Sequence, residues 1–202
     1  MREERGVYTV LARFVVEQPP SVALAVLTDY EAIPRFMPGV QSSTVLERSA
    51  GRAVVEQEAV STVMLFSKRI HLVLEIDEGA DALLFRDRCG RSFVKYEGAW
   101  RVTADDGRST ITYQLTAEPS FDVPGFMLKR LMRRDAAKMI EGLRREMAAR
   151  ATHSRVDSVR LPSGLHDLRD QRAVDVGEPL SRPLNFRALE ALTPTATVMR
   201  QR

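Results

Sequence analysis

Few side chains in this chain of 202 residues have the types and spacing that chemistry requires. The three histidines (His71, His153 and His166) lie far apart in the sequence, and neither HExxH nor CxxC spacing occurs, so no metal site is predicted. A GxSxG nucleophile motif and the glycine-rich motifs of nucleotide-binding proteins are also missing from the sequence. The sequence therefore predicts no catalytic residues, no metal and no cofactor.

The nearest approach to an acid–base pair is His71 with Glu75, which lie four residues apart on a predicted strand and share a face. Apolar residues alternate with them, so theirs is the solvent-facing side, which does not favour acid–base catalysis. Cys89 is the only cysteine, so no disulfide can form within the chain. Because it precedes Gly90 in a predicted hairpin turn, we interpret its thiol as structural or incidental.

Arg86 and Asp87 are neighbours on another predicted strand, so one of them should point inward. An inward Arg86 would orient a carbonyl or enolate of a ligand. Leu83 and Phe85 instead place Asp87 on their own face, where a buried carboxylate would need a partner. The sequence leaves this register open.

Alternation of apolar residues predicts strands at 7–17, 43–49, 52–62, 65–77, 82–88, 92–103 and 109–118. Two short helices are predicted after Pro19 and Pro20, where proline suits a first helical turn. The last six strands follow one another through short turns, so they form an antiparallel meander. On the next-to-last strand, one face is expected to hold Val94, Tyr96, Trp100 and Val102.

A strongly amphipathic helix of about 25 residues is predicted to follow the last strand. Its apolar stripe recurs at steps of three and four and consists of Leu128, Met132, Ala136, Met139, Ile140, Leu143 and Met147. The opposite face is basic and carries Arg130, Arg133, Arg134, Lys138, Arg144 and Arg145.

A curved sheet facing this helix can hold either a packed core or a hollow pocket. Methionine lines adaptable sites, and tyrosine and tryptophan bring polar tips into an apolar face, so these residue types favour a pocket. The ligand-binding residues that we predict are Phe36, Met37, Tyr96, Trp100, Tyr113, Met132, Met139 and Leu143. The loop Pro34–Gly39 is either a lip over the pocket, with Arg35 meeting an anionic group, or a rigid proline-shaped loop.

The run LTDYEAIPRFMPGV at 27–40 resembles a helix-to-loop signature of the START-like (SRPBCC) superfamily, in its polyketide cyclase/dehydrase and coenzyme Q-binding branch. The run EGAWRV at 97–102 is similar to the last hairpin of that branch. The resemblance covers about residues 7–150. It implies an α+β helix-grip fold, in which a seven-stranded antiparallel sheet wraps around the C-terminal helix and leaves an apolar cavity.

Three functions are compatible with this resemblance. The protein could carry or sense an apolar molecule, such as a lipid, a prenylated quinone or a polyketide-like compound, in an almost wholly apolar cavity. It could be an aromatase/cyclase for a polyketide chain, with charged residues converging in the cavity. It could also be a regulator that contacts a ribosome or another partner through the basic helix face, beside a small or filled cavity.

The basic face itself is interpreted as a solvated surface, as a contact with anionic membrane, or as a contact with RNA; no DNA is expected. The domain is predicted to span 1–152, and a mostly extended or disordered tail to span 153–202. The charged N-terminus has no apolar run behind it, so we expect a cytoplasmic protein, peripheral at a membrane if the basic face binds one.

Overall fold

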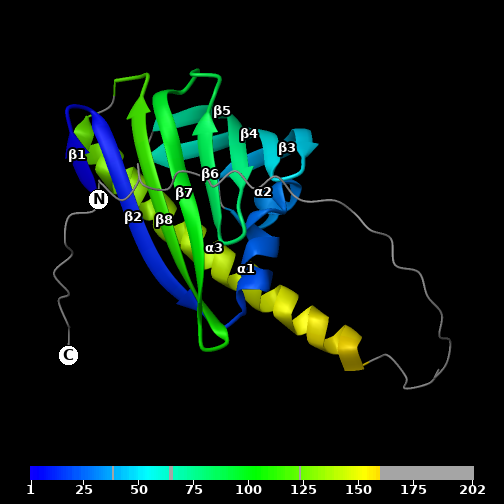
Figure 1. Cartoon of the computed structure of the whole chain (residues 1–202). Coiled ribbons are helices and arrows are strands. Elements are labelled where there is room, and N and C mark those ends of the chain that lie inside the picture. The colour runs from blue at the N-terminus through cyan, green and yellow to red at the C-terminus, as the bar shows by residue number, and fades with distance from the viewer. Residues whose placement is uncertain (38, 64–65, 123, 160–202) are drawn as a thin grey trace, which may run out of the picture. The chain divides into compact units, whose positions relative to one another are not determined.

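The computed structural model describes residues 1–37, 39–63, 66–122 and 124–159, with the side chains of 62–66 and 153–159 left aside (Figure 1). The described residues form one antiparallel sheet in the order β1-β2-β8-β7-β6-β5-β4-β3. The strands are β1 (Arg2–Glu4), β2 (Val7–Val16), β3 (Val40–Ser49), β4 (Arg52–Val63), β5 (Phe66–Glu78), β6 (Ala82–Asp87), β7 (Phe93–Asp105) and β8 (Arg108–Pro119). The α+β class and the helix-grip arrangement are therefore confirmed.

The described residues contain eight strands rather than the seven expected, because β1 pairs with β2 at the edge of the sheet. This strand is three residues long and its sequence is Arg-Glu-Glu, so no apolar alternation marks it in the sequence. Its three residues are all exposed; they extend the sheet by backbone pairing, and Glu3 also forms an ion pair with Lys129 of the long C-terminal helix, 2.6 Å between Oε2 and Nζ.

The helices are α1 (Pro20–Leu27), the short η1 (Tyr30–Ala32), α2 (Ile33–Phe36) and the long α3 (Gly125–Val159). Prolines occupy the first turns of α1 and α2, as the sequence predicts. Helix α3 has 35 residues, so it continues beyond the expected length of about 25. Residues 151–159 lose the apolar stripe but contain neither proline nor glycine, and nothing in them interrupts a helix. The rest of the predicted tail, 160–202, lies outside the described residues.

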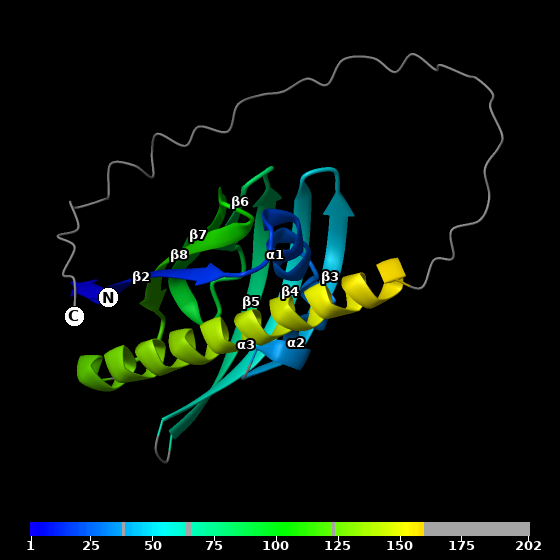
Figure 2. The same ribbon diagram turned by 90° about the horizontal axis from the view of Figure 1, so that it is seen from below.

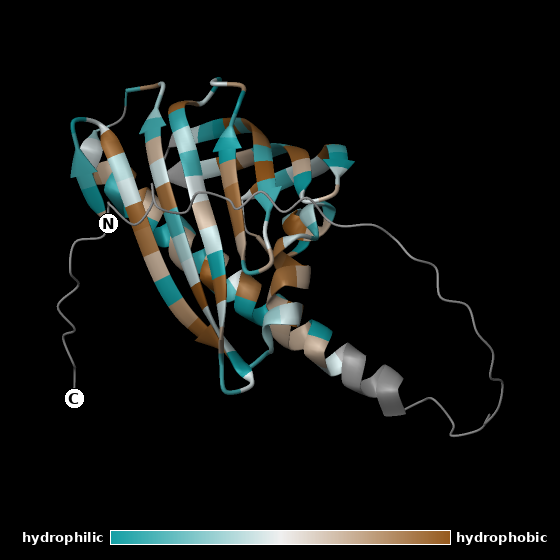
Figure 3. Ribbon diagram, in the orientation of Figure 1, coloured by the Kyte–Doolittle hydropathy of each residue, from teal (hydrophilic) through white to brown (hydrophobic). Residues whose placement is uncertain are grey.

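The sheet has two different faces, and helix α3 lies across one of them (Figure 2). We call the side that faces α3 the inner face and the opposite side the outer face. Along β8, Ile111, Tyr113 and Leu115 are buried on the inner face, and the residues between them are polar. Figure 3 shows the same alternation as changes of colour along the strands. The predicted period of two therefore holds for most of the sheet.

The placement of Val94 on the inner face is wrong. A register shift between Phe93 and Lys95 interrupts the pairing of β7 with β8, and Val94 is 68% exposed. Such an irregularity inserts an extra residue and reverses the alternation on one side of it. Tyr96, Trp100 and Val102, which follow the shift, keep the predicted face.

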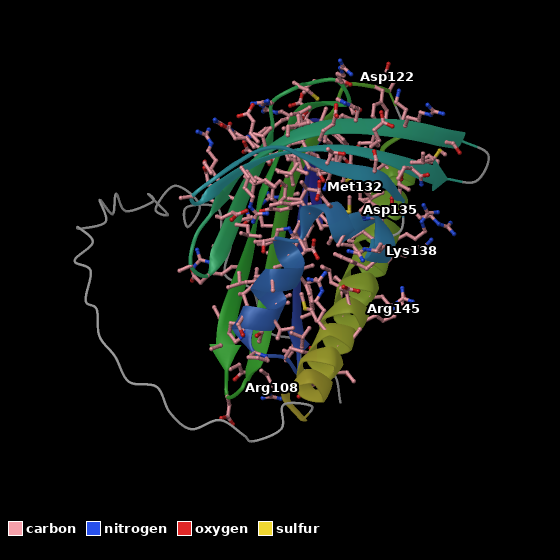
Figure 4. The ribbon with its side chains drawn as sticks, turned by 90° about the vertical axis from the view of Figure 1, so that its right-hand side faces the viewer. Arg108, Asp122, Met132, Asp135, Lys138 and Arg145 are labelled. Carbon is pink, nitrogen blue, oxygen red and sulfur yellow. The ribbon has the colours of Figure 1, made fainter. Side chains whose placement is uncertain are left out.

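The apolar stripe of α3 packs against the core as predicted. Leu128, Leu143 and Met147 are buried, and the other four members of the stripe are partly buried against the core. The basic residues of the opposite face lie at the surface, and Lys138, Arg144 and Arg145 are exposed. In Figure 4, Met132 and Asp135 lie toward the strands, whereas Lys138 and Arg145 lie on the side of α3 turned away from them.

Candidate functional site

A cavity of about 100 Å³ lies on the inner face of the sheet, between the short helices, the central strands and α3. Strands β4 to β8 supply one wall because their inward positions meet there, and α3 supplies Met139 and Leu143 from its apolar stripe. The lining residues are mostly apolar or aromatic: Val26, Leu27, Tyr30, Ile33, Phe36, Met37, Gln57, Leu74, Ile76, Leu83, Phe85, Tyr96, Trp100, Tyr113, Met139 and Leu143.

The structure brings together most of the residues that the sequence singles out for ligand binding. Among the described lining residues are Phe36, Met37, Tyr96, Trp100, Tyr113, Met139 and Leu143. Met132 is not among them; it packs against the edge of the core two turns before Met139. That these side chains contact a ligand stays a prediction.

The two apolar residues that the sequence analysis places in a lip lie where α2 ends, because Phe36 is the last residue of this helix and Met37 follows it. Phe36 is 8% exposed and Met37 is partly buried, and both line the cavity. Arg35 is exposed and is not among the described lining residues, so its contact with an anionic group stays a prediction. Whether the loop opens and closes stays a prediction.

An aromatic cluster forms the wall contributed by β6, β7 and β8. The ring centroids of Trp100 and Tyr113 are 4.3 Å apart, and the ring of Phe85 is stacked 6.3 Å from that of Tyr113. Gly98 lies between these residues on β7, and a Cβ there would be 2.6 Å from the Phe85 ring and 2.1 Å from the Gln114 carbonyl oxygen. Only glycine therefore lets the Phe85 ring lie against β7 and form this wall.

The side chains of Tyr96 and Tyr113 both line the cavity, and their hydroxyl groups lie close enough to affect each other's pKa. Burial raises the pKa of both phenols, and the pKa of Tyr113 lies well above its usual value because the Tyr96 hydroxyl adds to the effect. Both side chains are therefore neutral at physiological pH. A neutral hydroxyl pair can donate to or accept from one oxygen of a ligand, but it supplies no charge.

Two polar lining residues were missed by the sequence analysis. The ring of Tyr30 lines the cavity, and its hydroxyl donates a hydrogen bond to Glu78 Oε1 at 2.8 Å. The pKa of Tyr30 is raised, mainly by burial and further by the Glu78 carboxylate. The Gln57 amide lines the cavity from β4 and donates to Ser43 Oγ at 3.1 Å. The signal for Gln57 is its position two residues after the buried Val55, which places both on the same strand face, but its polar type hides it.

The described residues that line the cavity include no Asp, Glu, Lys, Arg or His. Within the described part of the chain, every buried side-chain nitrogen or oxygen has a hydrogen-bond partner. The same described residues contain no group of three or more His, Cys, Asp or Glu side chains placed to hold a metal ion. The arrangement can bind and orient an apolar molecule, and its described lining offers no charged pair for acid–base catalysis.

The open register of β6 is settled by the position of Asp87. Arg86 is exposed on the outer face, where its Nε donates to Glu75 Oε2 at 2.8 Å. The Asp87 carboxylate accepts hydrogen bonds from the backbone N–H groups of Val73, Cys89 and Gly90 at 2.8, 3.2 and 3.0 Å. Asp87 therefore shapes the β6–β7 turn, and Arg86 does not reach a ligand.

None of the helices in the described ranges combines the length and the apolar character that crossing a bilayer requires.

Residues 16–144 match a family described as polyketide cyclase / dehydrase and lipid transport. Solved structures share the fold at low sequence identity. A protein of Thermus thermophilus is 21% identical, with a TM-score of 0.63 over 70% of this chain and 98% of its own. The ZhuI aromatase/cyclase of a Streptomyces species is 16% identical, with a TM-score of 0.63 over 72% of this chain and 96% of its own.

A STAR-related lipid transfer protein of Xanthomonas axonopodis is 15% identical, with a TM-score of 0.55 over 73% of this chain and 97% of the fragment solved. No curated protein sequence matches the chain significantly. Because all three structures are below 25% identity, their likeness establishes the fold alone.

Proposed function

Since the chain belongs to the polyketide cyclase/dehydrase and lipid transport family of the START-like superfamily, we propose that it binds an apolar small molecule in the cavity between sheet and α3. The observation that carries the proposal is the lining, which combines apolar side chains with the neutral hydroxyl pair of Tyr96 and Tyr113. Removal of apolar surface from water would supply the affinity, at about 25 cal/mol per Å². The hydroxyl pair would set the orientation of a ligand oxygen.

The size of the cavity narrows the ligand. An apolar cavity of about 150 Å³ in another protein takes up benzene, so a cavity of about 100 Å³ holds at most one small ring. We propose that a ring bearing one oxygen lies against Trp100 and Tyr113. A prenylated quinone, a lipid chain or a polyketide would need a wider cavity, and the flexible side chains of Met37 and Met139 could move to provide it.

The absence of charged groups among the described lining residues favours a carrier or sensor over a polyketide aromatase/cyclase. A cyclase would need an acid or base within hydrogen-bond reach of the reacting carbon chain. The two tyrosine hydroxyls have raised pKa values, so they are poor bases at neutral pH. An aromatase/cyclase remains the alternative function, and substitution of Tyr96 and Tyr113 would test it.

The small cavity and the basic side chains at the surface of α3 agree with the third candidate, a regulator that contacts a partner. Contact with anionic membrane or RNA through this face would weaken steeply with salt, because it rests on charge. Sedimentation with anionic vesicles or ribosomes at low and high salt checks this candidate. Arg133→Glu would reduce a genuine contact, and no binding at low salt would reject it.

The cavity contains its own reporter, because Trp100 is the only tryptophan of the chain. Titration with phenols, naphthols, a short-chain quinone and a fatty acid should change the emission of Trp100 when a compound enters. We expect compact rings with one oxygen to saturate the signal at the lowest concentrations.

The control is a pair of equal substitutions. Val26 and Val55 are both 0% exposed, but only Val26 is among the cavity-lining residues. Val26→Phe should fill the cavity and abolish the titration, whereas Val55→Phe should retain it in whatever fraction stays folded. Equal titrations in wild type and Val26→Phe would show that the compounds bind elsewhere, and the proposal would then fail.

A further inference from the structure

A second group of chemically capable side chains lies away from the cavity, where β4, β5 and the β6–β7 turn meet. The Sγ atom of Cys89 is 3.6 Å from Nδ1 of His71, within the range of a hydrogen bond to sulfur. Nε2 of the same ring is 2.9 Å from Oε1 of Glu56. A nucleophile, a base and a group that orients the base are thus arranged in series.

The hydrogen bond to Glu56 determines which nitrogen of His71 is available. An ionised carboxylate only accepts hydrogen bonds, so Nε2 must carry the hydrogen that it donates to Glu56. In the neutral ring this leaves the lone pair on Nδ1, and Nδ1 is the atom that faces the thiol. The imidazole is therefore in the tautomer that can take a proton from Cys89, and Glu56 would stabilise the imidazolium that results.

These groups are accessible and separate from the cavity. The side chain of His71 is 19% exposed, that of Glu56 is 44% exposed, and Cys89 is partly exposed. His71 and Glu56 alternate along their strands with Leu72 and Val55, which are buried on the inner face. The site therefore opens on the outer face, and none of the three residues lines the cavity.

We propose that Cys89, His71 and Glu56 form a nucleophilic site whose thiol adds to α,β-unsaturated carbonyl compounds. His71 Nδ1 takes the thiol proton, and the sulfur forms a bond to the β-carbon. The alkene π pair shifts to form a double bond between the α-carbon and the carbonyl carbon, and the carbonyl π pair moves to the oxygen. The imidazolium then returns the proton to the α-carbon of the enolate. The product is a thioether that contains every atom of both reactants, so the step requires no oxidant and releases no leaving group.

The surroundings favour this reaction over other thiol chemistry. Acyl transfer needs N–H donors for an oxyanion, but the N–H groups of Cys89 and Gly90 already donate to Asp87. Disulfide formation within the chain is impossible because the sequence has one cysteine. Asp87 Oδ2 lies 3.5 Å from Sγ and competes with His71 for the thiol hydrogen, but both Asp87 oxygens are already engaged by backbone N–H groups.

The test is the rate at which the full-length protein is alkylated by N-ethylmaleimide, a small activated alkene, followed by intact-mass spectrometry. Wild type should take up one equivalent, and Cys89→Ser should take up none at the thiol. His71→Gln should slow the reaction at least about tenfold, because the base is lost. A rate for folded His71→Gln equal to that of wild type would overturn the proposal.

A second pair of variants keeps the test valid if His71→Gln unfolds and exposes its thiol. Glu56→Gln should slow alkylation by about threefold to tenfold, because an amide no longer fixes the tautomer. Glu58→Gln is the matched control, since Glu58 is exposed and stands opposite His71 in the β4–β5 register but has no hydrogen bond to the ring. Equal alkylation rates for the two glutamine variants would show that Glu56 acts only through its charge. That result would refute the arrangement of Cys89, His71 and Glu56 in series.

Glu56 is a positioning residue in this scheme, so its effect should depend on His71. In the double variant, Glu56→Gln should add nothing to the loss caused by His71→Gln. Independent and additive effects on the rate would contradict the arrangement in series. Circular dichroism of each variant ensures that the rates compare folded proteins.

Discussion

The two faces of the sheet use the same strands for different chemistry. On the inner face, Tyr96 and Tyr113 are neutral, and the remaining lining residues are apolar apart from Gln57 and the hydroxyl of Tyr30. On the outer face of β5, outward positions include His71 and Glu75, which engage charged or titratable partners. Alternation with a period of two is what allows both surfaces to coexist within one strand.

Each face of the sheet supports a different kind of function. The inner face excludes charge, so it can supply affinity for an apolar molecule but little acid–base chemistry. The outer face is solvated, so ionisable groups are tolerated there, but each contact is weaker. A charge introduced on the inner face should therefore lower the free energy of unfolding much more than a charge removed from the outer face.

The largest effect is expected when a charge is placed on the inner side. Met139→Lys puts an ammonium group on the apolar stripe of α3 and into the cavity wall, and it should lower the free energy of unfolding by about 3 kcal/mol or more. Chemical denaturation measures the loss. The neighbouring exposed Lys138→Met is the matched control and should change stability by less than about 0.5 kcal/mol. An unchanged midpoint for Met139→Lys would show that the stripe is misplaced.

The next largest effect on stability distinguishes a residue of the packed core from a residue that lines the cavity, both on the inner face. Val55→Phe should cost about 2 kcal/mol, because Val55 is 0% exposed and does not line the cavity. Val26→Phe should cost clearly less, since its ring can occupy the cavity. Thermal and urea unfolding of the two variants gives the comparison. If Val26→Phe cost as much as Val55→Phe, the cavity would not accept even one extra ring.

A smaller effect concerns the buried hydroxyl pair. Tyr113→Phe removes one partner and should cost about 1 kcal/mol near neutral pH. In the unfolded chain tyrosine loses its proton near pH 10, whereas burial raises the pKa of Tyr113 in the folded protein. The unfolded state therefore binds fewer protons above about pH 10, and the stability present below that pH is lost as the pH rises. Wild type should lose stability more steeply than Tyr113→Phe in this range; parallel curves would contradict burial of the pair.

The smallest effect is expected on the outer face. Glu75 is held by Arg86 and Arg52, whose side chains are 67% and 51% exposed, so solvent screens both ion pairs. Glu75→Gln should cost about 0.5 kcal/mol, and the loss should shrink further in salt. Urea unfolding at low and high ionic strength checks this. A loss as large as that of Met139→Lys would erase the contrast between the two faces.

Much of this architecture follows from sequence patterns. The period of two located seven of the strands within a few residues, and the steps of three and four along α3 identified its buried stripe. The strand β1 was missed because three charged residues show no alternation. The end of α3 was set too early, because the loss of amphipathic pattern was read as the end of the helix although no helix-breaking residue follows before Pro162.

The site was less predictable, because its members come together only through pairing across strands. Tyr96, Trp100 and Tyr113 were found by type and alternation, whereas Gln57 was hidden by its polarity. Cys89 and His71 are 18 residues apart, and Glu56 is 15 residues before His71. Their contact depends on the β4–β5 register and on the turn held by Asp87, and neither is encoded in local spacing.

Native mass spectrometry with compounds of increasing size tests directly whether the cavity on the inner face binds a ligand. After incubation with phenol-sized rings, the wild-type protein should appear as a one-to-one complex, and that complex should be missing from Val26→Phe. Extraction of the protein as purified would identify any molecule that it already holds. Equal occupancy in wild type and in folded Val26→Phe, or no complex with any compound, would contradict a ligand-binding cavity on the inner face of this sheet.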